Sequence, residues 1–238
     1  MKRVLFLTGY TDNYLPILDP NGADDTMGSV YEATLPSKLK YVEKHGYDFL
    51  SIRNFGQEKT PAPDEKFNNP TRDLGFIRIT RTLQMLQFYD VVMWIDADSL
   101  LTNQDVSVDD IIGENKEPFI ASHDWSNTNY VSSGNFIVQN TDKLDEFSEI
   151  FYNIAHAFPE EQSTINFIYS KSQDNGLVKI VDHKFLNSVP TREMYGKSWE
   201  GRKDIVCNWT DQSFLLHLTG ITNKTRHQIL QDHFKVFL

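Results

Sequence analysis

Short apolar runs alternate with segments of helical period along most of this chain of 238 residues. A run of about four to eight apolar or β-branched residues predicts a strand, whereas apolar residues that recur about every three or four positions predict a helix. The predicted strands are RVLFLTGY, YDFLSIRN, DVVMWI, PFIASHD and NFIVQN, and the predicted helices cover about 30–45, 71–88, 141–158 and 160–172. This alternation is typical of an α/β fold with a mainly parallel sheet.

Turn-forming residues mark the limits of these elements. Gly46 is expected to end the first helix, and Thr141 to cap the third, because a threonine hydroxyl can accept a hydrogen bond from a free backbone N–H. Prolines and glycines indicate a long polar loop over residues 55–70 and an irregular segment over residues 185–204. Neither an internal repeat nor a low-complexity segment interrupts the chain, so a single domain is predicted.

The composition favours a soluble protein without nucleic-acid or membrane partners. The formal net charge is −10, and an acidic chain repels nucleic acid and anionic membranes. The apolar run near the start, Val4–Leu7, is too short for a secretory signal, and no run reaches the roughly 18 residues of a membrane span. Cys207 is the only cysteine, so no intrachain disulfide can form, and burial of its thiol is expected. We therefore expect a cytoplasmic protein.

Two carboxylates, Asp96 and Asp98, directly follow the apolar strand DVVMWI. Ligands of open α/β sheets bind at the carboxyl ends of strands, and residues i and i+2 of an extended chain point the same way. Two such carboxylates repel each other unless a cation lies between them, and hard oxygen ligands suit Mg²⁺ or Mn²⁺. The pair therefore predicts a site for a divalent metal ion that coordinates a diphosphate. The alternative interpretation is a polar turn after a strand.

Several segments, in their order along the chain, carry a family resemblance. VMWIDADSLLTN resembles the D-x-D segment of nucleotide-sugar-dependent glycosyltransferases with the GT-A fold, and TGYTDNY resembles their nucleoside-contacting loop. LKYVEKHGYDF, SSGNFIVQN and EEQSTINFI resemble segments of the Golgi galactosyl-, mannosyl- and xylosyltransferase group. HLTGITNK resembles the H-x-x-G-x-x-K signature of the related glycogenin-like and lipopolysaccharide galactosyltransferase group.

The resemblance spans about residues 4–224 and implies a GT-A fold, Rossmann-like, in one domain. Its nucleotide-binding part would cover about residues 1–100 and its acceptor and catalytic part about residues 101–238. The chain departs from the family at Ser132, where the Golgi group has the asparagine of an N-A-G motif. The transmembrane anchor of the Golgi members is also missing, which suggests a minimal cytosolic version of bacterial or viral origin.

The resemblance also implies ligands for the metal and the diphosphate. Asp96 and Asp98 would bind the metal, with His217 as the third protein ligand, and imidazole with carboxylates suits Mn²⁺ better than Ca²⁺. Lys224 would pair with a diphosphate oxygen, and Gly220 would let the backbone approach the phosphates. The other residues expected at the donor through the matched segments are Thr8, Gly9, Tyr10, Asp12, Tyr14, Ala97 and Gly134.

A basic residue of the helix before the D-x-D segment reaches the donor in related enzymes. Arg78 and Arg81 lie one turn apart in the corresponding helix here. Arg81 fits the spacing of the Golgi group, and Arg78 fits that of the lipopolysaccharide group. Both stay candidates at this point.

Three residues are the candidates for sugar recognition and catalysis. Asp124 ends the strand PFIASHD, where a carboxylate could accept hydrogen bonds from sugar hydroxyls. Glu161 and Gln162 match the acidic-Gln pair that lies near the anomeric carbon in retaining relatives. Glu161 would bind sugar hydroxyls, and Gln162 would stabilise an oxocarbenium-like centre or act as a weak nucleophile. A helix start that favours acidic residues is the structural alternative.

Together these features predict a metal-dependent glycosyltransferase. It would move a hexose or pentose from a nucleotide-sugar donor with retention of anomeric configuration; a UDP-sugar is favoured, and GDP-mannose stays open as the donor. The acceptor would be a glycan, a glycolipid or a protein. Two alternatives stay open: a non-catalytic nucleotide-sugar-binding protein, and a haloacid-dehalogenase-like phosphatase, although that group carries its D-x-D motif on the first strand.

Overall fold

The computed structural model describes residues 2–10, 27–53, 70–125, 129–171, 176–195, 205 and 207–236. Its strands are β1 (Val4–Tyr10), β2 (Asp48–Arg53), β3 (Val91–Ile95), β4 (Ser99–Leu101), β5 (Phe119–Ser122), β6 (Asn135–Gln139), β7 (Val178–Val181) and β8 (Leu215–His217). Its helices are α1 (Met27–His45), α2 (Pro70–Met85), α3 (Val108–Ile112), α4 (Leu144–Ile154), the 3₁₀ turn η3 (Ala155–Ala157), α5 (Glu161–Lys171), α6 (His183–Leu186), α7 (Arg192–Tyr195) and α8 (Asn223–Phe234).

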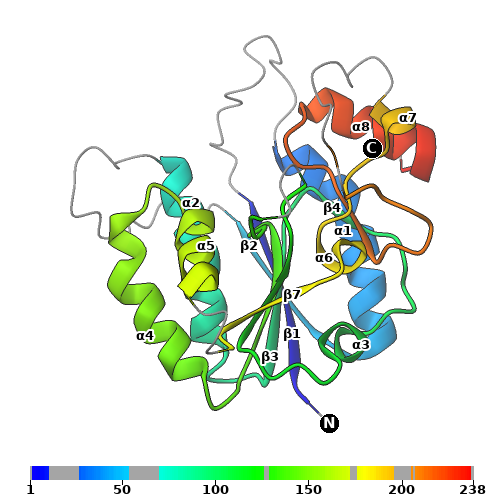
Figure 1. The fold of residues 1–238 in the computed structure, drawn as a ribbon. Helices are drawn as coiled ribbons and strands as arrows, with labels where there is room; N and C mark the ends of the chain where they lie inside the picture. The colour runs from blue at the N-terminus through cyan, green and yellow to red at the C-terminus, as the bar shows by residue number, and fades with distance from the viewer. Residues whose placement is uncertain are drawn as a thin grey trace.

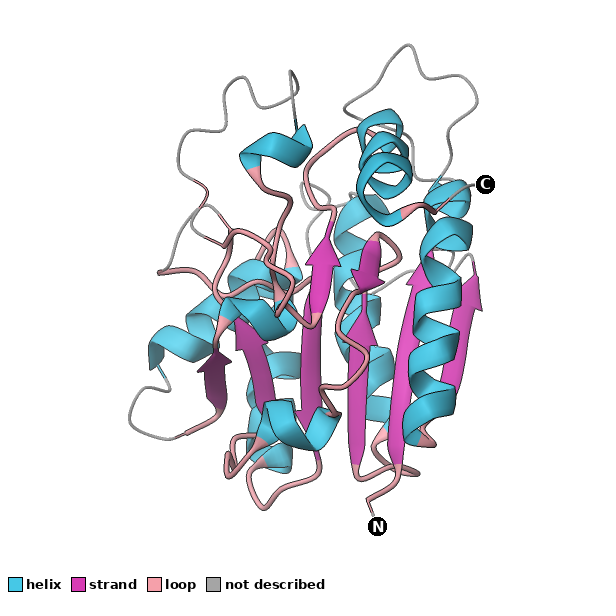
Figure 2. Cartoon of the chain, turned by 90° about the vertical axis from the view of Figure 1, so that its right-hand side faces the viewer, coloured by secondary structure: helices cyan, strands magenta, loops and turns pink. Residues whose placement is uncertain are grey.

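Six strands form one central sheet in the order β2-β1-β3-β6-β5-β7. The pairs β1–β2, β1–β3 and β5–β7 are parallel, and β6 runs antiparallel to both β3 and β5. Figure 2 shows these strands side by side with helices around them. The predicted α/β fold with a mainly parallel sheet is therefore confirmed, with β6 as the antiparallel strand.

Helices cover both faces of this sheet, because alternate side chains of its strands point to opposite sides. Leu5 and Leu7 of β1 pack in the cluster that includes side chains of α2, α4 and α5. Val4 and Phe6 pack in a second cluster with side chains of α1, α3 and α6. Figure 1 shows the same three layers, with α2, α4 and α5 on one side and α1, α3 and α6 on the other. The strands β1, β3, β5 and β6 are thus buried on both faces, which explains their nearly continuous apolar sequences, whereas the edge strand β2 is largely exposed.

Element boundaries differ from the sequence predictions in identifiable ways. The helix predicted from about residue 30 begins at Met27, and Pro36 lies inside it. The expected cap Thr141 is wrong: α4 begins at Leu144 behind Lys143, which makes no side-chain capping bond. The segment 185–204 is not irregular throughout, because it contains the last residues of α6 and all of α7. The loop predicted over residues 55–70 lies almost wholly outside the described residues.

A two-stranded antiparallel sheet of β4 and β8 was not predicted from the sequence. Its register sets Ser99 opposite His217. The N-terminus lies at one end of the central sheet, while α8 lies at the other end, toward which β1 runs (Figure 1). The small sheet therefore brings the C-terminal part of the chain to the turn that follows β3.

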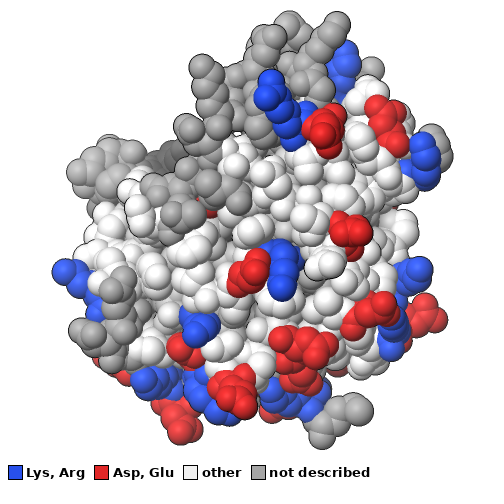
Figure 3. All heavy atoms as spheres, turned by 45° about the vertical axis from the view of Figure 1, so that its right-hand side comes forward, with Lys and Arg blue, Asp and Glu red and all other residues white. Residues whose placement is uncertain are grey.

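No helix within the described ranges is both long and apolar enough to cross a bilayer. On the face shown in Figure 3, acidic and basic side chains lie interspersed rather than sorted by sign. That face therefore does not present the one-sign field that attracts a polyanion or a polycation.

Candidate active site

The acidic pair lies on a turn that is bonded to the central sheet. Asp96 follows β3 directly, and its backbone N–H donates to Oδ1 of Asn135 over 3.1 Å. The hydroxyl of Ser99 donates to the same oxygen over 2.9 Å. Asn135 is fully buried on β6 and pairs with Ile95 in the sheet register. One buried amide thus holds both ends of the Asp96–Ser99 turn.

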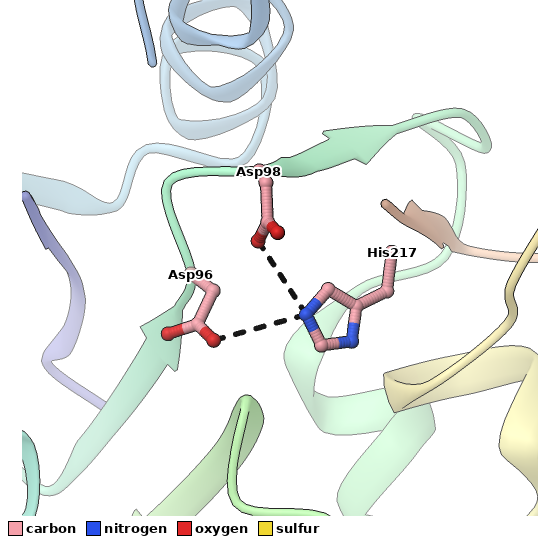
Figure 4. Close-up of side chains that lie close together, drawn as sticks. All are labelled: Asp96, Asp98 and His217. Carbon is pink, nitrogen blue, oxygen red and sulfur yellow. Dashed lines mark ion pairs between the residues drawn. The ribbon is translucent and has the colours of Figure 1, made fainter. Parts of the chain in front are cut away.

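His217 reaches this turn through the small sheet. The N–H of Leu218 donates to the Asp98 carbonyl over 3.0 Å, which continues the β4–β8 pairing. Nε2 of His217 lies 3.7 Å from Oδ2 of Asp96 and 3.4 Å from Oδ1 of Asp98. Figure 4 shows both carboxylates and the imidazole converging on one point. The possible ligand atoms of the three residues all lie within 4.8 Å of one another, so these residues could hold a metal ion.

The hydrogen bonds around His217 favour the tautomer that a metal requires. Its Nδ1 lies 2.8 Å from Oδ1 of Asn187, and the Asn187 amide nitrogen donates to the His123 carbonyl over 2.8 Å. The Asn187 oxygen therefore faces the imidazole and accepts from Nδ1–H. Nε2 is then the ring nitrogen that faces the carboxylates, and it is the atom through which the imidazole would bind a metal ion. The donor set thus fits a divalent cation.

Two arginines neutralise the negative charges of the two carboxylates. Nη1 of Arg78 donates to both oxygens of Asp96, over 2.6 and 2.8 Å, while Nη2 donates to Glu161. Nη2 of Arg226 donates to Oδ2 of Asp98 over 2.8 Å. Burial raises the pKa of Asp98, but the charge of Arg226 above all, with contributions from His217 and Lys38, lowers it more, so this pKa lies well below its usual range. Asp98 is therefore ionised, as a metal ligand must be.

A chain of polar contacts leads from the acidic pair to the candidate catalytic residues. The Ser133 hydroxyl donates to Oε1 of Glu161 over 2.8 Å, and Oε1 of Gln162 lies 3.3 Å from the same hydroxyl. The Gln162 amide nitrogen lies 3.4 Å from Oδ2 of Asp124. Through Arg78, Glu161 connects to Asp96. The fold thus brings Asp124, Glu161 and Gln162 beside the candidate metal cluster, although they come from distant parts of the sequence.

Of the two candidate arginines, Arg78 belongs to this cluster. Nη1 of Arg81 donates instead to Oε1 of Gln84 on the same helix, over 2.8 Å. Contact of either arginine with a donor stays a prediction.

Two glycines allow the close approach of the functional side chains. A Cβ added to Gly134 would lie 2.5 Å from Cε1 of His217 and 3.0 Å from Oδ2 of Asp96. A Cβ at Gly75 would lie 1.7 Å from Oε2 of Glu161. Gly134 was predicted to contact the donor, and the structure places it directly against the candidate metal ligands. Gly75, which the sequence analysis missed, makes room for Glu161.

The predicted nucleotide-contacting residues are only partly described. Thr8 and Gly9 are buried in β1. Tyr10 stacks on Tyr31 with ring centroids 4.5 Å apart, and Ala97 packs in the same cluster as these two rings. The two remaining loop residues of this prediction, Asp12 and Tyr14, lie outside the described residues. Nucleotide contact therefore stays a prediction.

The predicted diphosphate contacts lie between β8 and the first turn of α8. Gly220 adopts a left-handed φ of 66°, a conformation that glycine reaches without strain. Lys224 is exposed at the start of α8. Three residues separate Gly220 from Lys224, one more than the H-x-x-G-x-x-K signature contains. The assignment of Lys224 to the diphosphate stays a prediction.

Besides Gly75, four residues that build the site were not predicted from the sequence: Lys38, Asn135, Asn187 and Arg226. For Lys38 a signal existed, because the spacing of Tyr31, Thr34, Lys38 and Tyr41 places all four on one face of a helix. The other three residues lie in segments that are distant from the acidic pair in sequence. No local sequence pattern shows that these segments pack against it.

The sequence matches no family model and no curated protein. Solved structures do resemble the fold. A glycosyltransferase involved in the glycosylation of the major capsid of PBCV-1 superposes with a TM-score of 0.58 and 16% identity, over 94% of this chain and 96% of that one. Mouse xyloside xylosyltransferase 1, in its apo form, superposes with a TM-score of 0.52 and 7% identity, over 90% of this chain and 97% of that one.

The bifunctional glycosyltransferase WbbM gives a TM-score of 0.51 at 12% identity, over 97% of this chain and 50% of that one. These three structures are glycosyltransferases, and each aligns with nearly the whole of this chain. The chain therefore has the GT-A glycosyltransferase fold that the resemblance of its motifs predicted.

Proposed function

We propose that this protein is a metal-dependent glycosyltransferase. It moves a hexose or pentose from a nucleotide-sugar donor, a UDP-sugar in preference to GDP-mannose, to a glycan, glycolipid or protein acceptor with retention of configuration. One observation carries the proposal: Asp96, Asp98 and Nε2 of His217 converge at the carboxyl end of β3. This is the position at which open α/β sheets bind their ligands.

A divalent ion bound there, Mn²⁺ or Mg²⁺, would supply Lewis-acid stabilisation of the departing nucleoside diphosphate. Asp98 and His217 are held for this task by Arg226 and Asn187. The Arg226 bond also places the start of α8 beside the cluster, and the N-terminus of a helix favours anions. Lys224, in that first turn, would donate to a diphosphate oxygen and offset charge on the leaving group.

The sugar would lie along the polar chain of Glu161, Gln162 and Asp124. Asp124 and Glu161 would accept hydrogen bonds from sugar hydroxyls, while Gln162 would face the oxocarbenium-like centre. The acceptor hydroxyl would attack from the face of the leaving group, whose phosphate oxygen would take the proton. A covalent route would instead need Glu161 or Gln162 as nucleophile. Glu161 is buried and bonded to Arg78 and Ser133, which favours a binding role for it.

Thermal unfolding tests the donor site. The melting temperature is measured with UDP, GDP, CMP and their sugar derivatives, each with Mn²⁺ or with EDTA. A ligand at about 100 times its Kd adds about 2.7 kcal/mol to the free energy of unfolding, which corresponds to a rise of about 5–10 °C for a chain of this size. We expect such a rise with one nucleotide in Mn²⁺, and its loss in EDTA.

Two variants make the test specific. Asp98→Asn should lose the Mn²⁺-dependent rise, whereas Asp145→Asn, at an exposed position of α4, should keep it. If no nucleotide raises the melting temperature of the wild-type protein, whether in Mn²⁺ or in EDTA, the proposed function is wrong. Binding without release of sugar would identify a non-catalytic nucleotide-sugar-binding protein instead.

A further inference from the structure

The amino group of Lys38 lies buried beneath the turn that carries the acidic pair. Lys38 belongs to α1, and none of its surface is exposed. Its Nζ donates to the carbonyl of Ser99 over 2.7 Å, to the hydroxyl of Thr34 over 2.8 Å and to the carbonyl of Ala97 over 3.3 Å. Three oxygen acceptors match the three N–H donors of an ammonium group.

A buried lysine is costly, so this position calls for an explanation. Removing an ammonium from water costs several kcal/mol even after the protein relaxes, and this burial lowers the pKa of Lys38 to about 7. A leucine or methionine would fill the same space on α1 without that cost. The two carbonyls that Lys38 binds belong to the residues on either side of Asp98. The lysine therefore contacts the one segment whose orientation decides where the acidic pair points.

The hydrogen bonds of Thr34 strengthen the same attachment. Its hydroxyl accepts from Lys38 and lies 2.6 Å from the Ala97 carbonyl, to which it can donate. With these carbonyls turned toward α1, the Asp98 carboxylate lies on the side of His217, as Figure 4 shows. The Ala97 carbonyl belongs to the peptide unit that joins Ala97 to Asp98, so rotation of that unit would turn the Asp98 side chain away from the imidazole.

We propose that Lys38 is a positioning residue that fixes the Asp96–Ser99 turn, so that Asp96, Asp98 and His217 form one metal site. This inference rests on the proposed function, because it assigns Lys38 to the metal site of that function. It also predicts in which direction the affinity for a cation changes when Lys38 is replaced. If Lys38 acted through its charge alone, its removal would tighten the binding of a cation. If it acts by positioning, its removal weakens that binding.

The test measures the Kd of Mn²⁺ for the purified protein by electron paramagnetic resonance of the free ion. Loss of a residue that orients a metal ligand typically weakens metal binding about 10–100-fold. We expect Lys38→Met to raise the Kd of Mn²⁺ at least about tenfold, within that range. The control is Lys40→Met, which removes an exposed lysine from the same helix and should leave the Kd unchanged.

A second variant keeps the test informative if Lys38→Met does not fold. Thr34→Val retains the lysine but removes the hydroxyl that joins it to Ala97, and it should raise the Kd by a smaller factor. Unchanged or tighter Mn²⁺ binding in a folded Lys38→Met protein, or in Thr34→Val if only that variant folds, would overturn the inference. Absence of Mn²⁺ binding by the wild-type protein would instead overturn the proposed function, so the two failures are distinguishable.

Discussion

Replacement of Arg78 by methionine should destabilise the protein strongly. The guanidinium donates to both oxygens of Asp96, over 2.6 and 2.8 Å, and to Glu161. The side chains of Arg78, Asp96 and Glu161 are only 17%, 20% and 8% exposed, so water cannot replace the lost bonds fully. Removal of one partner from a buried ion pair costs about 3–5 kcal/mol, because the remaining charge is left uncompensated.

The loss in the free energy of unfolding is measured by denaturant unfolding in EDTA. EDTA removes metal ions that could otherwise neutralise the charge of Asp96. The expected loss is about 3–5 kcal/mol, with a fall in melting temperature of about 10 °C. The control, Lys40→Met, removes an exposed cationic side chain from α1. That control should lose no more than about 1 kcal/mol. A similar small loss in Arg78→Met would refute the charge compensation inferred for this cluster.

Three further predictions concern single positions. Gly134→Ala should weaken Mn²⁺ binding at least about tenfold, because its Cβ would lie 2.5 Å from Cε1 of His217; an unchanged Kd in a titration would contradict the geometry. Arg226→Met should be less stable than the wild type in denaturant unfolding at pH 7, since Arg226 helps to lower the pKa of Asp98. That stability is present above the unfolded pKa of about 3.9 and is lost as pH falls below it, so a difference that persists undiminished at pH 3 would count against this cause. Burial raises the pKa of the Cys207 thiol to about 11, so a thiol reagent at pH 8 should modify the native protein far more slowly than the urea-unfolded chain, and equal rates would show an accessible thiol.

The sheet and the acidic pair were predictable because their signals are local. β3 is an unbroken apolar strand that is buried on both faces, and Asp96 and Asp98 follow it in sequence. The position of such a pair at a strand end is a general property of α/β folds. For these elements, a few neighbouring residues carry all the information that the prediction needs.

The surroundings of the pair were not predictable from the residues alone, because they depend on contacts between distant segments. β4 and β8 contain three residues each, too few to show a period, yet their pairing brings His217 to Asp98. Family resemblance had named His217, but it had not indicated Arg226, which reaches Asp98 from 128 positions away. Thr141 failed as a helix cap because α4 begins only at Leu144, and cap signals locate helix ends only approximately.

Release of a nucleoside diphosphate tests the central claim most directly. The protein is incubated with Mg²⁺ or Mn²⁺, with UDP-glucose, UDP-galactose, UDP-xylose or GDP-mannose, and with a panel of saccharide acceptors. We expect release from at least one donor, and loss of that release in EDTA and in Asp98→Asn. Release that persists in both conditions, or no release from any donor by a protein that binds the nucleotide, would contradict metal-dependent sugar transfer at Asp96, Asp98 and His217.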